Sequence, residues 1–194
     1  TFVTSLDRRV ADTDCSGISY DAISDTTSVT VPYTVVGEVE AWTRGADAGE
    51  QLIVVSATGT TVVLEGDQSS TDFWIGVPYE SFYTFSLQFP RNPRTGTLLN
   101  GFYYLNKGYI NYNKSGPFMV TVTVNGVDYE ELAGPKIGSY VIGEPPVESG
   151  TVEFSILAEN YDVEIQVSSR GALPMALVTA GFKGRLDLRG YAGS

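Results

Sequence analysis

Apolar and polar residues alternate with a period of two along much of the chain, most clearly between residues 102 and 132. From residue 118 to 124, apolar side chains alternate with Met119, Thr121 and Thr123, which places the two sets on opposite faces of a strand. Asn125-Gly126 follows directly, and this pair is preferred in two-residue type I′ turns because both positions need φ > 0. The sequence therefore predicts a hairpin here, and a third strand at 109–113 extends it to a three-stranded meander.

The same alternation predicts strands along the rest of the chain. A hairpin is expected around Thr58-Gly59-Thr60, and residues 151–157 and 161–167 are expected to form a strand pair. The aromatic face of residues 79–89 is expected to lie on a core. The other expected strands are 1–10, 29–31, 35–42, 73–75 and 174–188, the last one broken at Gly181. Because no amphipathic helix is found, the predicted fold is all-β, an antiparallel sandwich or barrel-like domain built from hairpins and meanders.

Three segments lack this pattern. Residues 11–28 are rich in Asp, Ser, Thr and Gly and are expected to form a loop. Residues 90–96 contain two prolines and are expected to form an exposed loop. Residues 134–150 are rich in Gly and Pro, but their apolar members suggest attachment to the body of the protein.

Composition narrows the range of functions. The chain has 42% hydrophobic residues, which is typical of a globular protein. Its net charge of −11 argues against a surface that tracks nucleic-acid phosphates. The absence of His excludes His-based catalytic triads and His-ligated zinc within these 194 residues, and Cys15 has no second cysteine for an internal disulfide.

Candidate binding residues are mostly aromatic or basic. Twelve Tyr and two Trp invite a sugar-binding interpretation, although packing is the commoner use of aromatic residues at alternating strand positions. The basic end of an otherwise acidic chain suggests an ion-paired edge or a contact with an acidic neighbour. The candidate interface or glycan contacts are Tyr103, Tyr104, Tyr109, Lys183, Arg185 and Arg189, with Trp42 as a further candidate for glycan.

The acidic residues offer two weaker hypotheses. Glycoside hydrolysis needs two carboxyl groups facing across a cleft, whereas most acids here lie on the polar faces of predicted strands. Asp12 and Asp14 have the spacing of paired calcium ligands, but no Gly or distal Glu completes a calcium loop, so a solvated acidic loop is the favoured interpretation. No catalytic residue, metal site or cofactor is predicted.

The later part of the chain contains, in order, the stretches GVPYESFYTFS, LLNGFYYLNKGYINYNKSGPFMVTVTV, VDYEELAG, KIGSYVIG, SGTVEFSILAENYDVEIQVSS and PMALVTAGFKGRLDLR. In this order they resemble the C-terminal part of the tail tubular protein B, or tail nozzle protein, of short-tailed bacteriophages. The resemblance is best over residues 74–189, where Phe182 and Lys183 replace a Trp and an acid of the family.

The resemblance implies a non-enzymatic structural protein of the virion tail. Residues 1–194 would be the C-terminal β-rich nozzle region of a longer tail protein, with a sub-boundary near residues 70–76. Such proteins assemble as a hexameric ring below an adaptor, with tail fibres nearby, and enclose the channel through which the DNA leaves. They help to retain and release the genome, and negative charge in the channel would keep phage DNA from binding on its way out. The alternative is a carbohydrate- or receptor-binding module of the tail that contacts the host outer surface.

Overall fold

The computed structural model describes residues 6–45, 48–90, 94, 102–135 and 146–187. These residues form strands joined by turns, with one short 3-10 turn, η1 (Asp12–Asp14). None of the described segments forms a helix long and apolar enough to cross a membrane. The predicted all-β class is confirmed.

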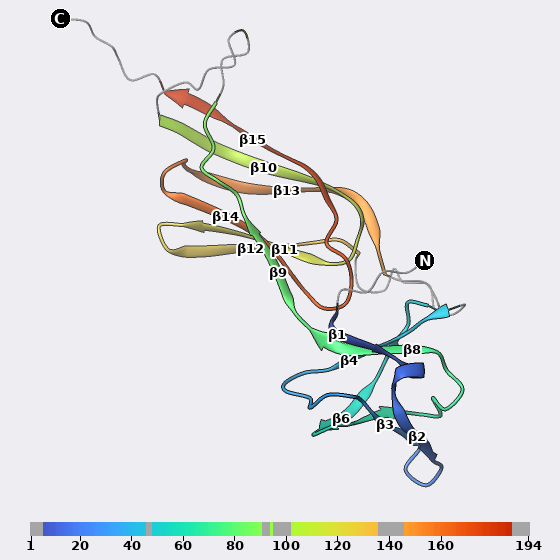
Figure 1. Cartoon of the computed structure of the whole chain (residues 1–194). Helices are drawn as coiled ribbons and strands as arrows, with labels where there is room; N and C mark the ends of the chain where they lie inside the picture. Colours follow the sequence, from blue (N-terminus) through green and yellow to red (C-terminus); the bar gives the residue numbers. More distant parts are fainter. Residues whose placement is uncertain (1–5, 46–47, 91–93, 95–101, 136–145, 188–194) are drawn as a thin grey trace, which may run out of the picture. The chain divides into compact units, whose positions relative to one another are not determined.

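The chain forms two compact units that divide between Glu80 and Ser81 (Figure 1). The first unit holds β1 to β8 and, from later in the chain, Arg170–Pro174; the second holds the strands from β9 onward. The strands of the first unit are β1 (Leu6–Ala11), β2 (Ser16–Asp21), β3 (Thr26–Thr30), β4 (Glu40–Thr43), β5 (Gln51–Leu52), β6 (Val54–Thr58), β7 (Thr61–Glu65) and β8 (Phe73–Pro78).

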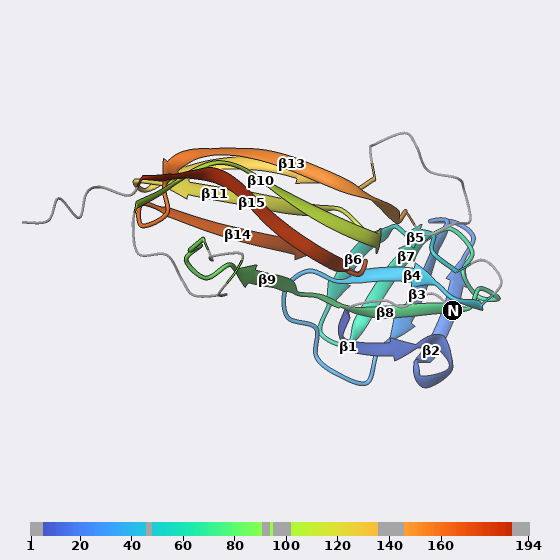
Figure 2. The same cartoon turned by 90° about the horizontal axis from the view of Figure 1, so that it is seen from above.

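The first unit is a sandwich of two antiparallel sheets. One sheet has the order β1-β8-β4-β5 and the other β2-β3-β7-β6, and β1, β8 and β4 can be seen side by side in Figure 2. Val29, Val62 and Leu64 from one sheet meet Phe73 and Ile75 from the other, and all five are fully buried. Apolar alternation thus builds a core between the sheets.

The second unit contains β9 (Glu80–Thr84), β10 (Phe102–Ser115), β11 (Phe118–Val124), β12 (Val127–Ala133), β13 (Glu148–Glu159), β14 (Val163–Arg170) and β15 (Leu177–Asp187). It is also a sandwich, with one sheet in the order β13-β10-β15, as Figure 1 shows, and the other in the order β12-β11-β14-β9. Its core joins Leu105 and Ile110 of the first sheet to Phe118, Val120 and Val167 of the second.

The two predicted hairpins are confirmed. Val124 faces Val127 across Asn125-Gly126, whose φ angles of 51° and 79° are those of a type I′ turn. Thr58 faces Thr61 in the β6–β7 hairpin, and Gly59 has a φ of 61°. In both hairpins the turn residues set the register of the two strands.

The predicted pairings between other strands are wrong. β10 does not continue the β11–β12 hairpin as a meander, because it pairs with β13 and β15 in the opposite sheet. β13 and β14 likewise lie in different sheets and do not pair with each other. In each case the connection crosses from sheet to sheet, because the apolar faces of both strands must meet in the core.

Four predictions about single segments also need correction. The expected loop at residues 11–28 contains β2 and the start of β3; β2 is an exposed edge strand and therefore lacks apolar alternation. Regular strand structure in 35–42 begins only at Glu40. The aromatic face of 79–89 meets the core only in part: Phe85 packs against the core of the second unit, whereas Tyr79, Tyr83 and Leu87 are each about half accessible, because β9 is a short edge strand. β15 continues through Gly181 without a break, since the glycine leaves room for the ring of Tyr109 on the neighbouring strand.

Most of the expected loop at 90–96 and most of the segment 134–150 lie outside the described residues.

Candidate functional site: surfaces of the second unit

The candidate residues on β10 and β15 divide between the two faces of one sheet. Tyr104 stands opposite Arg185, and Lys107 stands opposite Lys183, on the face that points away from the core. Tyr103 is half-buried and packs against the core, so it belongs to the inner face. Arg189 lies outside the described residues.

The two outward-facing tyrosines differ in what they can bind. Tyr104 is exposed, and its hydroxyl donates to the backbone oxygen of Leu157 at 2.8 Å. Tyr109 is half-buried: one side of its ring covers Gly181, and the Lys183 ammonium lies 5.7 Å from the ring centroid. Tyr104 therefore remains as the aromatic residue of this face most accessible to a ligand.

Charged side chains surround these rings on the same face. Lys107 Nζ lies 2.7 Å from Glu153 Oε2, and this hydrogen bond, together with the charges of Lys107 and Lys183, lowers the pKa of the Glu153 carboxyl. Both side chains are about half exposed, so the pair adds little to stability. Lys183 and Arg185 leave the β15 side of the face cationic.

Further along the same face, hydrogen bonds link the side chains of all three strands. Asn111 on β10 donates to Thr179 on β15 at 2.8 Å and accepts from Thr151 on β13 at 2.6 Å. Ser149 donates to Asn113 at 2.8 Å. These contacts link the exposed polar side chains of the three strands to one another.

A groove of about 480 Å³ lies at the opposite edge of the second unit, between β12 and β13. Three acidic residues line the groove, Glu130, Glu131 and Glu153. The apolar residues that line it include Val122, Val124, Phe154 and Ile156. The acids of β12 were expected to be solvated, and they are exposed. The sequence of residues 127–132 did not indicate the groove. Their alternation predicts a strand with one buried face, whereas the groove exists because β12 is exposed on both faces.

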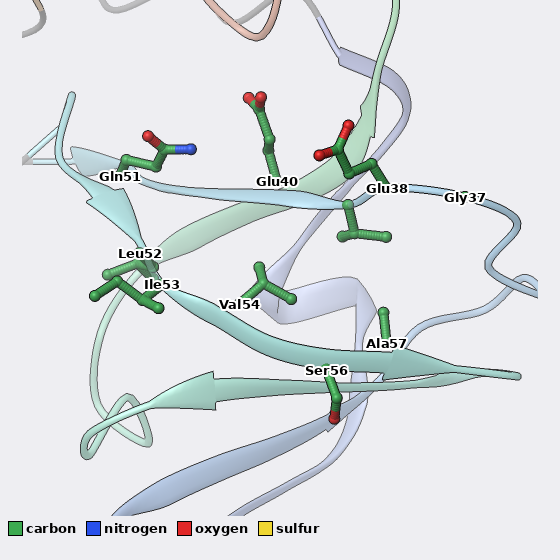
Figure 3. A pocket seen from close by; sticks show the side chains of 10 residues that line it. Gly37, Glu38, Glu40, Gln51, Leu52, Ile53, Val54, Ser56 and Ala57 are labelled. Atoms are coloured by element: carbon green, nitrogen blue, oxygen red, sulfur yellow. The ribbon is translucent and has the colours of Figure 1, made fainter.

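The first unit has a hollow of about 540 Å³ lined by two acids, Glu38 and Glu40 (Figure 3). Both carboxylates come from one chain segment and project to one side, while Leu52 and Val54 lie below them. Glu38 pairs with Arg170 at 2.5 Å, and Glu40 accepts from the Trp42 indole at 3.0 Å. The two acids do not face each other across the hollow as hydrolysis would require.

Trp42 itself is buried, with 6% of its surface accessible. The hypothesis that it stacks on a sugar is therefore wrong, because stacking needs an exposed ring face and almost none of this side chain is accessible.

Asp12 has a structural role in the first unit. Its Oδ1 accepts from Arg44 Nε at 2.5 Å and from the backbone N–H of Phe73 at 3.2 Å, tying η1 to β8. Burial raises the pKa of Asp12, but the hydrogen bonds from Arg44 and Phe73 and the Arg44 charge outweigh it, so the pKa lies below its usual value. Among the described residues, no group of three or more acidic or cysteine side chains is placed to hold a metal ion.

We expect Asp12→Asn to lower the free energy of unfolding at pH 7 by about 1–2 kcal/mol, because a charge-assisted hydrogen bond is replaced by a neutral one. Since the folded-state pKa is depressed, the ionised carboxylate stabilises the fold above its unfolded pKa, near 4, and this stabilisation is lost as the pH falls through the folded pKa. Urea denaturation at pH 7 and pH 3 measures the effect. A wild-type advantage that persists unchanged at pH 3 would contradict it.

Cys15 packs against the core of the first unit, beside Asp12 and Asp14. Burial and the two neighbouring carboxylates raise the pKa of its thiol to about 11. We expect alkylation by iodoacetamide at pH 8 to be on the order of 100-fold slower than for a free cysteine, because the thiolate is the reactive form. Mass spectrometry of timed samples tests this, with urea-unfolded protein as the control; equal rates in the folded and unfolded protein would refute it.

Comparison with known protein families identifies the chain. A sequence model described as bacteriophage nozzle protein matches residues 1–192. The chain belongs to the bacteriophage nozzle protein family. A search of curated proteins found no match.

Membership of the nozzle family makes the protein a structural component of the virion tail. The match extends from the first strands to the last and so covers both sandwiches. The family resemblance expected from the order of the motifs is confirmed.

Proposed function

We propose that the chain is part of a tail nozzle, in which identical subunits form a hexameric ring around the channel for phage DNA and help to retain and release the genome. The nozzle-family match over residues 1–192 carries this proposal. Two sandwiches with fully buried apolar cores and hydrogen-bonded faces suit a wall that must stay rigid while DNA passes. The tail adaptor and the tail fibres are the further proposed partners, as the resemblance implies.

The proposed interaction with DNA is passage without specific binding. A net charge of −11 repels the phosphate backbone, and this repulsion weakens as salt increases. We expect no retention of duplex DNA by the purified protein at physiological salt in a gel-shift assay. Salt-dependent retention would contradict this part of the proposal.

Native mass spectrometry and negative-stain electron microscopy of the purified protein test the assembly. We expect a single closed ring with cyclic symmetry. A protein that stays monomeric at tens of micromolar concentration would overturn the proposal of ring assembly.

The alternative, a receptor- or carbohydrate-binding module, is favoured by one observation, the exposure of Tyr104 beside Arg185. Glycan-array binding that is lost in Tyr104→Ala and retained in Tyr20→Ala, another exposed tyrosine, would favour this alternative. Ring assembly without glycan binding would favour the nozzle.

A further inference from the structure

Two edge strands of the second unit carry opposite charges. β12 ends the sheet β12-β11-β14-β9, and β15 ends the sheet β13-β10-β15. β12 bears Asp128, Glu130 and Glu131 and has no basic residue, whereas β15 presents Lys183 and Arg185. All five side chains are exposed.

β12 overhangs the sandwich and is exposed on both faces. Glu131 stands opposite Val120 and Tyr129 opposite Val122, so these two residues are on the side of the core. Glu130 stands opposite Thr121 and therefore lies on the outer side. In a sandwich the core side of a strand is normally covered by the facing sheet, yet Tyr129 on the core side of β12 is 59% exposed. Leu132, on the outer side of β12, is 62% exposed. The acidic groove lies on the core side of this overhang.

An exposed edge of this kind is a surface that β-proteins usually cover or use. Its outer backbone groups have no strand partner in the sheet. Burial of its exposed apolar side chains by a partner would also stabilise a complex. The carboxylates of Glu130 and Glu131 form no ion pair within the described part of the chain, so they can accept cations from outside.

β15 has the complementary chemistry. Lys183 and Arg185 project from the outer face, next to Lys107, and Glu153 already pairs with Lys107. The long aliphatic stems of Lys and Arg can cover apolar surface while their charged ends reach carboxylates. The same chain therefore presents an acidic, partly apolar edge and a cationic strand at two separate places.

We propose that the edge of β12 and the groove beneath it bind the outer face of β15 from a second copy of the chain, with Glu131, on the core side of the edge, and Glu130, on its outer side, flanking Lys183 and Arg185. The inference rests on the ring assembly proposed above and names its subunit contact. Because β12 and β15 are different surfaces, the contact is heterologous. An open assembly therefore keeps one unoccupied β12 surface and one unoccupied β15 surface, at its two ends, until the ring closes. A polyanion is disfavoured as the occupant of the groove, because three carboxylates line it.

Charge reversal on each side tests the contact. In Glu130→Lys/Glu131→Lys both surfaces become basic, and in Lys183→Glu/Arg185→Glu both become acidic. We expect each variant alone to associate about 100-fold more weakly than wild type, because like charges now face each other. An equimolar mixture of the two variants should assemble again, since each reversed surface meets a complementary one on the other variant.

The matched control is Glu164→Lys, which reverses an exposed acid on β14, two strands away from β12 in the same sheet. We expect it to assemble like wild type. Native mass spectrometry measures assembly, and circular dichroism verifies that each variant is folded.

The outcomes separate this inference from the proposed function. If wild type forms rings and the two double variants also do, or if folded variants fail to assemble on mixing, the β12–β15 contact is wrong while the ring proposal stands. If Glu164→Lys disrupts assembly as strongly as the β12 variant, a general charge effect replaces the contact. If wild type is monomeric, both proposals fail.

Discussion

Phe73→Ala is expected to lower the free energy of unfolding of the first unit by about 3–5 kcal/mol, the usual cost of deleting a buried aromatic ring. Phe73 is fully buried between the two sheets of that unit and starts β8, which pairs with both β1 and β4. The free energy of unfolding of a small domain is about 5–15 kcal/mol in total, so this substitution would remove a large part of the stability of the first unit.

Hydrogen exchange followed by mass spectrometry measures this effect segment by segment. Amides of β3, β7 and β8 should lose protection in Phe73→Ala, while those of β11 and β14 keep it, because the two cores are separate clusters. Phe118→Ala is the mirror control, since Phe118 is buried in the core of the second unit and should give the reverse pattern. Equal loss of protection in both units from either variant would show that they unfold as one.

Asn160→Leu is expected to destabilise the second unit by about 2–5 kcal/mol, because it leaves two backbone groups without partners. Asn160 is fully buried. Its side-chain Nδ2 donates to the backbone oxygen of Gln88 at 3.0 Å, and its Oδ1 accepts from the backbone N–H of Tyr103 at 3.3 Å. Leucine has a similar size but cannot replace either hydrogen bond. The side chain thus ties the connection between β13 and β14 to β10 and to the segment after β9.

Thermal or urea unfolding of Asn160→Leu and Asn160→Ala measures the effect. The two variants should be similarly unstable if the orphaned backbone groups dominate, whereas a nearly wild-type Asn160→Leu would show that filling the volume is sufficient. The matched control is Asn113→Leu, which changes an exposed asparagine on β10 and should cost under about 1 kcal/mol.

Local sequence signals predicted the parts of the fold that depend on neighbouring residues. Asn125-Gly126 set the turn between β11 and β12, and Gly59 set the one between β6 and β7, because positive φ at those positions needs no information from elsewhere. The period of two likewise predicted which side chains of β11 and β13 face the core.

Pairings over long distances were not predictable in this way. The alternation within β10 is compatible with pairing in either sheet of the second unit. β10 pairs with β13 and β15, which come dozens of residues later in the chain, so its place could not be predicted from local sequence. Gly181 looked like a strand break, but only the position of Tyr109 on the adjacent strand shows why a glycine is needed there.

The candidate surface shows the same division. The sequence indicated Lys183 and Arg185 as a basic end and Tyr104 as an aromatic candidate, because residue type alone marks them. The sequence could not show that Tyr103 turns inward, that Lys183 lies over Tyr109, or that β12 overhangs an acidic groove.

The all-β class, the tight hairpins and the family could all be read from the order of the residues, because they depend on local alternation, turn chemistry and the succession of motifs. Which strands share a sheet, and which charged edges stay open, became known only from the folded chain. Pairing and exposure are set by the packing of two sheets against each other, and that packing involves residues far apart in the sequence.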